Sequence, residues 1–159
     1  MFRELVRKKN ELSKEVCIEV LKTETRGVLS VLGDDGYPYG TPLNHFYNEE
    51  DGKIYFHVGN QRSHRTDALK NCNKVSYCVY DQGYRKEGEW AYNVKSVIVF
   101  GRVEIIDDMD KIVDITTKLT QKFTDDEEYL RKEIEQNAHR TLLLELTVDH
   151  MCGKRVNES

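Results

Sequence analysis

Cationic and hydroxyl side chains gather where a predicted strand gives way to a predicted helix. The strand covers residues 53–58, and the loop after it carries Arg62. Ser63 is placed as the N-cap of the helix, with His64 and Arg65 in its first turn. First-turn amides lack intrahelical acceptors and carry partial positive charge, so two cations there are unfavourable unless an anion binds. The pattern therefore indicates a phosphate pocket, or alternatively a solvated loop beside a helix start.

A second segment that could bind a ligand is residues 36–46. Pro42 lies inside a predicted strand and has no N–H to donate, so this strand should be an edge strand or bulged there. An edge leaves backbone amides free, and a planar heterocycle could accept hydrogen bonds from those around Leu43 to His45. Alternatively, Asn44 and His45 cap the following turn or face solvent.

Composition and motifs exclude several classes of function. The net charge of −4 gives no general attraction to nucleic acid, and no stretch has the apolar character of a signal peptide or bilayer span. We therefore expect a cytoplasmic protein without nucleic-acid or membrane partners. The chain lacks the dinucleotide, Walker and serine-hydrolase fingerprints. His150 and Cys152 alone are too few ligands for a metal site, so no metal is predicted.

Apolar periodicity and turn residues predict the elements that position these segments. The predicted strands cover residues 28–32, 39–47, 53–58, 75–80, 94–106 and 141–148. The first predicted helix covers residues 12–21, is capped by Ser13 and is ended by Gly27, and the second covers residues 63–71. The third has an apolar face made of Ile112, Ile115, Leu119 and Phe123. The fourth opens with a capping box at residues 124–127. Gly101 should mark a bulge or sharp bend in the longest strand.

Three of these strands follow one another within residues 28–58, joined by tight turns, which makes an antiparallel meander. Six twisted strands with corner glycines favour a closed or half-closed barrel over an open sheet. At this length we expect one domain, residues 1–159, that is mainly β with flanking helices and contains a six-stranded antiparallel barrel.

The chain resembles a known family over nearly its whole length. The matching segments are Gly27–Gly33, Asp35–Asn44, Ile54–His57, Asp67–Lys70, Lys74–Val79, Ser96–Gly101 and His150–Lys154. In this order and spacing they resemble the nitroimidazole-resistance flavoproteins, within the wider pyridoxamine 5′-phosphate oxidase-like superfamily. The resemblance implies a split β-barrel that binds FMN, usually as a homodimer with a flavin at each end of the interface.

The resemblance also implies roles for individual residues. The residues expected against the flavin ring are Pro42, Leu43, Asn44 and His45; those near the ribityl chain or ring edge are His57 and Val58; those around the phosphate are Arg62, Ser63, His64 and Arg65; and those closing over the site are Ser96 and Val97. The family's phosphate loop often has Lys where this chain has Arg, and one residue fewer. Which of Arg62 and Arg65 contacts phosphate therefore stays open.

The implied activity is that of an FMN-dependent reductase, which passes electrons from a nicotinamide or other small-molecule donor to a nitroimidazole-type or other electron-poor acceptor. His45 is a candidate proton donor or substrate contact. Trp90 and Tyr92 are candidates for an aromatic lid over the substrate, or for core or dimer-interface packing. Two alternatives remain: a non-catalytic flavin- or haem-binding module of the same barrel, and a pyridoxamine phosphate oxidase-like enzyme.

Overall fold

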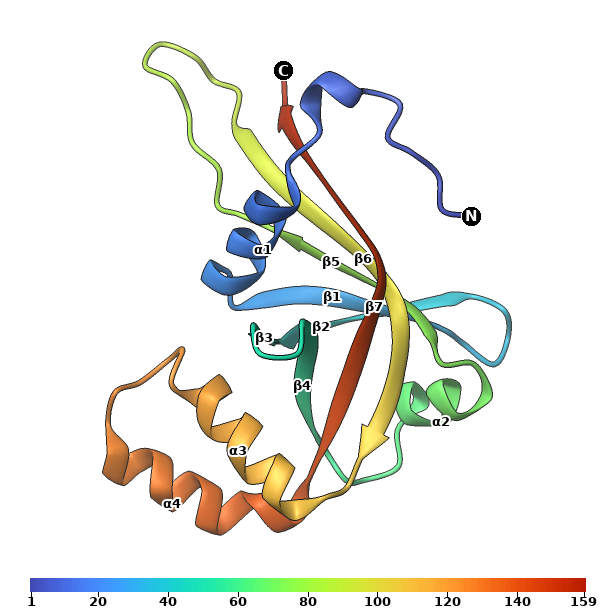
Figure 1. Ribbon diagram of the computed structural model, residues 1–159, viewed down its shortest axis with the longest axis vertical. Coiled ribbons are helices and arrows are strands. Elements are labelled where there is room, and N and C mark those ends of the chain that lie inside the picture. The colour runs from blue at the N-terminus through green and yellow to red at the C-terminus, as the bar shows by residue number, and fades with distance from the viewer.

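The computed structural model describes residues 1–159, which form one curled antiparallel sheet with four α-helices around it (Figure 1). The strands are β1 (Arg26–Leu32), β2 (Pro38–Asn44), β3 (Phe46–Asn48), β4 (Lys53–Gly59), β5 (Lys74–Tyr80), β6 (Asn93–Ile106) and β7 (Thr141–Asn157). The helices are α1 (Lys14–Thr23), α2 (His64–Asn71), α3 (Met109–Thr120) and α4 (Glu127–Asn137). None of them combines the length and the apolar character that crossing a membrane requires.

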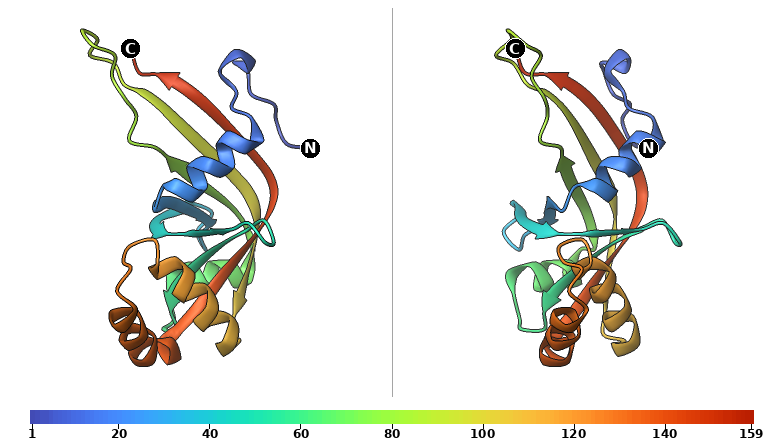
Figure 2. Two further views of the ribbon diagram at one scale, coloured as in Figure 1. Left: turned by 60° about the vertical axis from the view of Figure 1, so that its left-hand side comes forward. Right: turned by 90° about the vertical axis from the view of Figure 1, so that its left-hand side faces the viewer.

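The sheet curls because its two edge strands are consecutive in the chain. The strand order is β2-β1-β5-β6-β7-β4-β3, and neighbouring strands are antiparallel. Only His45 separates the end of β2, at one edge, from the start of β3, at the other. Since adjacent strands lie about 4.8 Å apart, one residue cannot cross a flat sheet of this width. The two edges must meet, and the sheet forms a half-barrel (Figure 2).

The prediction of a mainly β protein with flanking helices is confirmed, but the strand count is seven instead of six. The strand expected over residues 39–47 is interrupted at His45 and becomes β2 and β3. The last strand was expected to end at Val148, and it continues to Asn157 because the first half of β6 provides a partner for residues 150–157.

Gly101 produces the bend that the sequence predicted in the longest strand. The pairing of β6 with β7 shifts register between Phe100 and Gly101. A Cβ atom at position 101 would overlap the carbonyl oxygen of Thr147 on β7. Only glycine permits this close approach, and the long β6–β7 ribbon bends here over the rest of the barrel (Figure 1).

Strands β4 and β7 are apolar on both faces because each face is covered. Phe56 of β4 and Leu144 of β7 point into the main core, which α1 closes with Leu21. Tyr55 and Leu143, the alternate residues, pack on the other face in a smaller cluster with the apolar stripe of α3. This two-sided burial explains why these strands show weak polar–apolar alternation in the sequence.

The helix ends agree in part with the sequence prediction. The Ser13 hydroxyl accepts from the backbone N–H of Val16 and caps α1, as expected. Gly27 does not end this helix, because α1 stops at Thr23 and Gly27 belongs to β1. The capping box at 124–127 is also wrong: Asp126 is the N-cap of α4 and accepts from Tyr129. The connection between α3 and α4 is therefore longer than predicted.

Candidate functional site

A groove opens where the two edges of the half-barrel face each other. Strand β3 pairs only with residues 53–55 of β4, so the end of β4 has no strand partner on that side. Opposite it runs β2, which is an edge strand, as Pro42 predicted. Between them lies a pocket of about 390 Å³ whose walls are Arg26, Pro42, Leu43, Asn44 and His57. The pocket thus brings together three residues that the sequence assigned to the flavin ring, Pro42, Leu43 and Asn44, with His57, which it assigned to the ribityl chain or ring edge.

Arg26 is the member of this pocket that sequence reasoning missed. It pairs with Asn44 across the β1–β2 hairpin, and its Nε donates to Asn44 Oδ1 at 3.2 Å. The strand register could have predicted this contact, because a hairpin that turns around Asp35 places residue 26 opposite residue 44. Arg26 adds a positive charge to a groove that is lined by backbone and neutral side chains.

The N-terminus of α2 lies at the end of β4, with Ser63 as its predicted cap. The Ser63 hydroxyl accepts from the N–H of Thr66 at 3.2 Å, and the N–H of Ser63 donates to Thr66 Oγ1 at 3.0 Å. These two residues satisfy each other. The first-turn N–H groups of His64 and Arg65 have no acceptor in the chain. Such free amides are the donors that an anion at a helix N-terminus uses.

Arg62 and Arg65 have different surroundings. Arg62 is 86% exposed, and its Nε donates to Asp67 Oδ2 at 2.8 Å. Arg65 is half-buried against β2, where its Nη1 donates to Thr41 Oγ1 at 3.2 Å. The Arg65 Nε is buried and has no hydrogen-bond partner, and burial lowers the pKa of this side chain. A buried charged donor without an acceptor is costly, which marks Arg65 as the arginine with an unused donor.

His64 packs against the β1–β2 hairpin next to Arg65. Its ring stacks on Tyr39 with centroids 4.3 Å apart. The ring also lies close to Gly33, where a Cβ atom would come 3.3 Å from His64 Nε2. Because Thr41 and Pro42 follow Tyr39 along β2, the anion end and the groove share one edge strand.

The structure contradicts the expectation that the His45 side chain reaches a ligand. His45 is fully buried, and its Nε2 lies 2.7 Å from the carbonyl oxygen of Leu21. This nitrogen must carry the proton, so Nδ1 accepts from the hydroxyl of Tyr77 at 2.7 Å. The backbone N–H of His45 donates to the Thr25 carbonyl. Burial and the positive charge of Lys122 lower the pKa of His45 to about 4. His45 fastens the crossing between the two edges.

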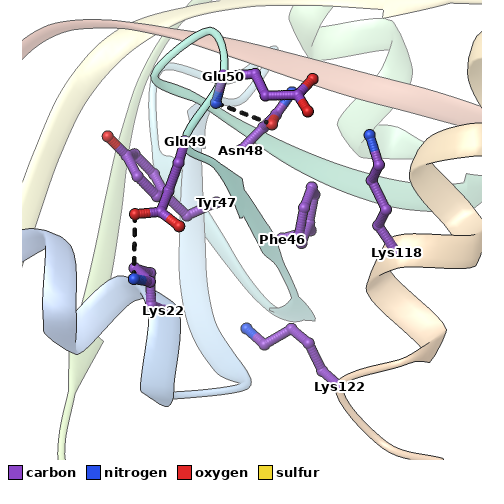
Figure 3. A pocket seen from close by; sticks show the side chains of 8 residues that line it. All are labelled: Lys22, Phe46, Tyr47, Asn48, Glu49, Glu50, Lys118 and Lys122. Atoms are coloured by element: carbon purple, nitrogen blue, oxygen red, sulfur yellow. Dashed lines mark hydrogen bonds and ion pairs between the residues drawn. The ribbon is translucent and has the colours of Figure 1, made fainter. Parts of the chain in front are cut away.

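Lys122 holds the same crossing from the opposite side. Its Nζ donates to the carbonyl oxygens of Glu24 at 2.8 Å and His45 at 3.0 Å. It lines a separate pocket of about 290 Å³ beside Phe46 (Figure 3). Burial lowers the pKa of Lys122 to about 8. The other two lysines of this pocket are ion-paired, Lys22 with Glu49 and Lys118 with Asp114. All three amines therefore have partners within the protein. The role of Lys122 was not predicted from the sequence.

Within one copy of the chain, the remaining predicted residues lie outside the groove. Val58 and Val97 are core residues with buried side chains. Ser96 pairs with residues 80 and 154 in the half of the sheet away from α2. Trp90 and Tyr92 are exposed in the long loop between β5 and β6, at the same far end (Figure 1). Neither aromatic residue packs in the core.

The fold and groove define a class of small half-barrel proteins with a ligand-sized groove between the two sheet edges. A comparison of the sequence with protein families identifies the family. The chain belongs to the pyridoxamine 5′-phosphate oxidase family, whose model matches residues 13–155. This confirms the superfamily that the sequence resembled. No curated protein is similar enough in sequence to count as a relative.

Solved structures share the fold at low sequence identity. A candidate 5-nitroimidazole antibiotic resistance protein from Bacteroides thetaiotaomicron is 19% identical with a TM-score of 0.75, over 92% of this chain and 87% of that chain. A conserved hypothetical protein from Mycobacterium tuberculosis is 14% identical with a TM-score of 0.79, over 95% and 90%. A FAD- and haem-binding protein from Mycobacterium smegmatis is 21% identical with a TM-score of 0.71, over 92% and 72%.

Proposed function

We propose that this protein is an FMN-binding flavoprotein, with residues 1–159 forming one cofactor-binding domain, and that it acts as an FMN-dependent reductase. The observation that carries the proposal is the buried, unpartnered Nε of Arg65. The guanidinium of Arg65 contacts Thr41 of β2, the edge strand that also lines the groove, and Arg65 lies in the helix turn that has two free amides. These groups suit a phosphate, and the adjoining pocket suits a flat ring.

In this proposal Arg65 and the amides of His64 and Arg65 hold the phosphate, since a guanidinium and backbone N–H groups are strong donors to phosphate oxygens. Ser63 positions these amides by capping α2. Arg62, paired with Asp67, stays at the rim. The resemblance leaves the choice between the two arginines open, and the free donor favours Arg65.

The ring would lie along Pro42, Leu43 and Asn44, with His57 at its edge. Arg26, held by Asn44, provides a positive charge that favours an electron-rich bound group. Val58 would support this site from the core. His45 would contribute indirectly, by fixing the backbone that follows Asn44.

Ser96, Val97, Trp90 and Tyr92 do not line the groove of their own chain. The proposal therefore includes a homodimer in which Ser96, Trp90 and Tyr92 of each copy complete the other's site, while Val97, whose side chain is buried, supports this region from the core. The exposure of Trp90 and Tyr92 is consistent with interface packing or with a lid over the partner's groove.

A bound flavin supplies the redox chemistry, taking two electrons from a nicotinamide or similar donor and delivering them to an electron-poor acceptor. The protein's own residues bind, orient and shield. The likeness to a candidate nitroimidazole-resistance protein supports a nitroimidazole-type acceptor. The FAD- and haem-binding protein of similar fold, together with the exposed His57 imidazole in the groove, supports the second candidate, a non-catalytic flavin- or haem-binding module.

The spectrum of the purified protein and two titrations test the proposal. Wild-type protein should bind FMN more tightly than riboflavin, which lacks the phosphate. Replacing Arg65 by Met should weaken FMN binding about 10- to 100-fold, the value of one or two charge-assisted hydrogen bonds, and leave riboflavin binding unchanged. Arg62→Met is the matched control and should change neither. A haem Soret band without flavin, or equal binding of FMN by both variants, would overturn the proposal.

Reductase activity needs its own test. Flavin-loaded protein should be bleached anaerobically by NADH or NADPH and recoloured by a nitroimidazole. Protein that binds FMN but is not reoxidised by any electron-poor acceptor would be a carrier, the second candidate.

A further inference from the structure

A second cleft adjoins the groove on the side of the α3–α4 connection. It has a volume of about 550 Å³ and shares Asn44 and His57 with the pocket at the sheet edges. The opposite wall comes from the connection and from α4, including Phe123 and Tyr129. A molecule in this cleft would therefore meet a molecule in the groove at Asn44 and His57.

Two aromatic side chains line this cleft without being buried in a core. Phe123 is 50% exposed and Tyr129 is 51% exposed. Phe123 was expected on the buried face of α3, but that helix ends at Thr120 and releases it into the connection. Large apolar side chains exposed in a concave site favour a planar partner that covers them.

The charged residues of the cleft have one sign. Asp126 and Glu133 line it, and no lysine or arginine does. Asp126 accepts from the N–H of Tyr129, and Glu133 accepts from the side chain of Asn137. Neither carboxylate is ion-paired, and the basic residues of α4, Arg131 and Lys132, pair with Glu135 and Glu128. Lys122, next to Phe123 in sequence, is turned away toward backbone carbonyls.

The groove has the opposite polarity. Its charged side chain is Arg26, and Arg65 lies at its far end. Cationic groups therefore face the proposed cofactor, and carboxylates face whatever enters the cleft. Partial desolvation lowers the pKa of His57, which stands between the two regions.

We propose that this cleft is the acceptor site and that it selects planar aromatic compounds that are neutral or cationic over anionic ones. The inference rests on the proposed function, because the groove must hold the flavin. It also implies that pyridoxamine 5′-phosphate, the substrate that gives the family its name, is a poor fit for this cleft. The phosphate of that compound would meet two carboxylates and no cation. Stacking on Phe123 and Tyr129 supplies affinity, while Asp126 and Glu133 supply charge selection.

The test uses three acceptors of one shape and different charge: para-nitrobenzylamine, para-nitrobenzyl alcohol and para-nitrobenzoate. Calorimetric titration of the flavin-loaded protein measures binding without turnover. We expect the amine to bind most tightly and the benzoate most weakly. The double variant Asp126→Asn, Glu133→Gln should tighten benzoate and weaken the amine, each by about threefold per carboxylate, as partly exposed charges do, and leave the alcohol unchanged. Asn keeps the N-cap of α4.

Two further variants make the test specific. Glu127→Gln is the charge-matched control on α4, because Glu127 is exposed and does not line the cleft, and it should leave the order unchanged. Phe123→Leu should weaken all three compounds to a similar degree. A flavin-loaded protein that binds benzoate as tightly as the amine, or keeps its preference in the double variant, would overturn this inference and leave the proposed function standing. Protein that binds no flavin would overturn the proposed function, and with it the assignment of the cleft as an acceptor site.

Discussion

Glu145 and Arg65 are two charged side chains of this half-barrel that are at least partly shielded from water, and they differ in how many partners they have within the chain. Glu145 of β7 has a side chain that is 6% exposed, and its two oxygens meet Lys53 at 2.8 Å, the hydroxyl of Tyr55 at 3.1 Å, and Lys111. Arg65 is half-buried with one hydrogen bond and an unsatisfied Nε. A charge with all its partners inside the chain contributes to the fold. A charge that lacks a partner indicates a place for a ligand.

The surroundings of Glu145 explain why it is structural. Burial alone would raise the pKa of its carboxyl, but hydrogen bonds from Lys111, Lys53 and Tyr55 outweigh burial and lower the pKa to about 2. These partners come from α3 and β4, so the carboxylate ties the helix to the outer face of the sheet. Nothing remains free for a ligand.

The largest expected effect follows from removing Glu145. Glu145→Ala leaves two lysines without their acceptor and should lower the free energy of unfolding by about 3 kcal/mol, as breaking a shielded ion pair does. Urea unfolding monitored by circular dichroism measures it. Glu104→Ala is the control, because Glu104 lies opposite Glu145 on β6 and is exposed. A loss no larger than that of the control would contradict a structural role.

An intermediate effect is expected from acid, through His45. The folded pKa of about 4 lies below the ordinary value of 6.5, so the unfolded chain binds the proton more readily. The contribution of His45 to the free energy of unfolding is therefore fully present above pH 6.5 and is lost as the pH drops toward 4. The loss amounts to about 2 kcal/mol between pH 7 and pH 5. This window lies above that of Glu145, whose contribution is lost below its ordinary pKa of 4.5. Urea unfolding at both pH values measures the loss.

Substitution separates the contribution of His45 from that of other groups. His45→Gln should be less stable at neutral pH and should lose most of the slope between pH 7 and pH 5. His139→Gln removes an exposed histidine and should keep the slope. An unchanged slope in His45→Gln would show that acid acts elsewhere.

The smallest expected effect on stability is that of Arg65→Met. Removing a shielded guanidinium with one neutral hydrogen bond should change the free energy of unfolding of the flavin-free protein by less than about 1 kcal/mol, in either direction. The same variant should lose FMN affinity. Stability as low as that of Glu145→Ala would place Arg65 with the structural charges and remove the contrast between the two sites.

Local signals in the sequence predicted much of this architecture. Pro42 indicated an edge strand, Gly101 a bend, and Ser13 and Ser63 helix caps, because each depends on a residue's own backbone chemistry. The sequence also indicated the groove residues Pro42 to Asn44. These features need no knowledge of distant contacts.

Non-local features were missed. The break at His45 depends on the meeting of two sheet edges, and the predicted strand over residues 39–47 contains no turn signal there. The burial of His45 depends on Leu21 and Tyr77, which are remote in sequence. The extension of β7 depends on β6 as a partner. Asp126 replaced the expected cap of α4 because capping boxes with neighbouring acidic residues offer several competing starts.

The one-residue crossing at His45 also determines how the groove can move. Two successive Cα steps span at most about 7 Å, so the rims formed by β2 and β4 stay tethered beside Asn44. We therefore expect any opening of the half-barrel to pivot about that point, with the largest separation of the two rims near Arg65. A bound ligand would then enter and leave with its phosphate end first, while its ring end turns beside Asn44, where the two rims hardly move.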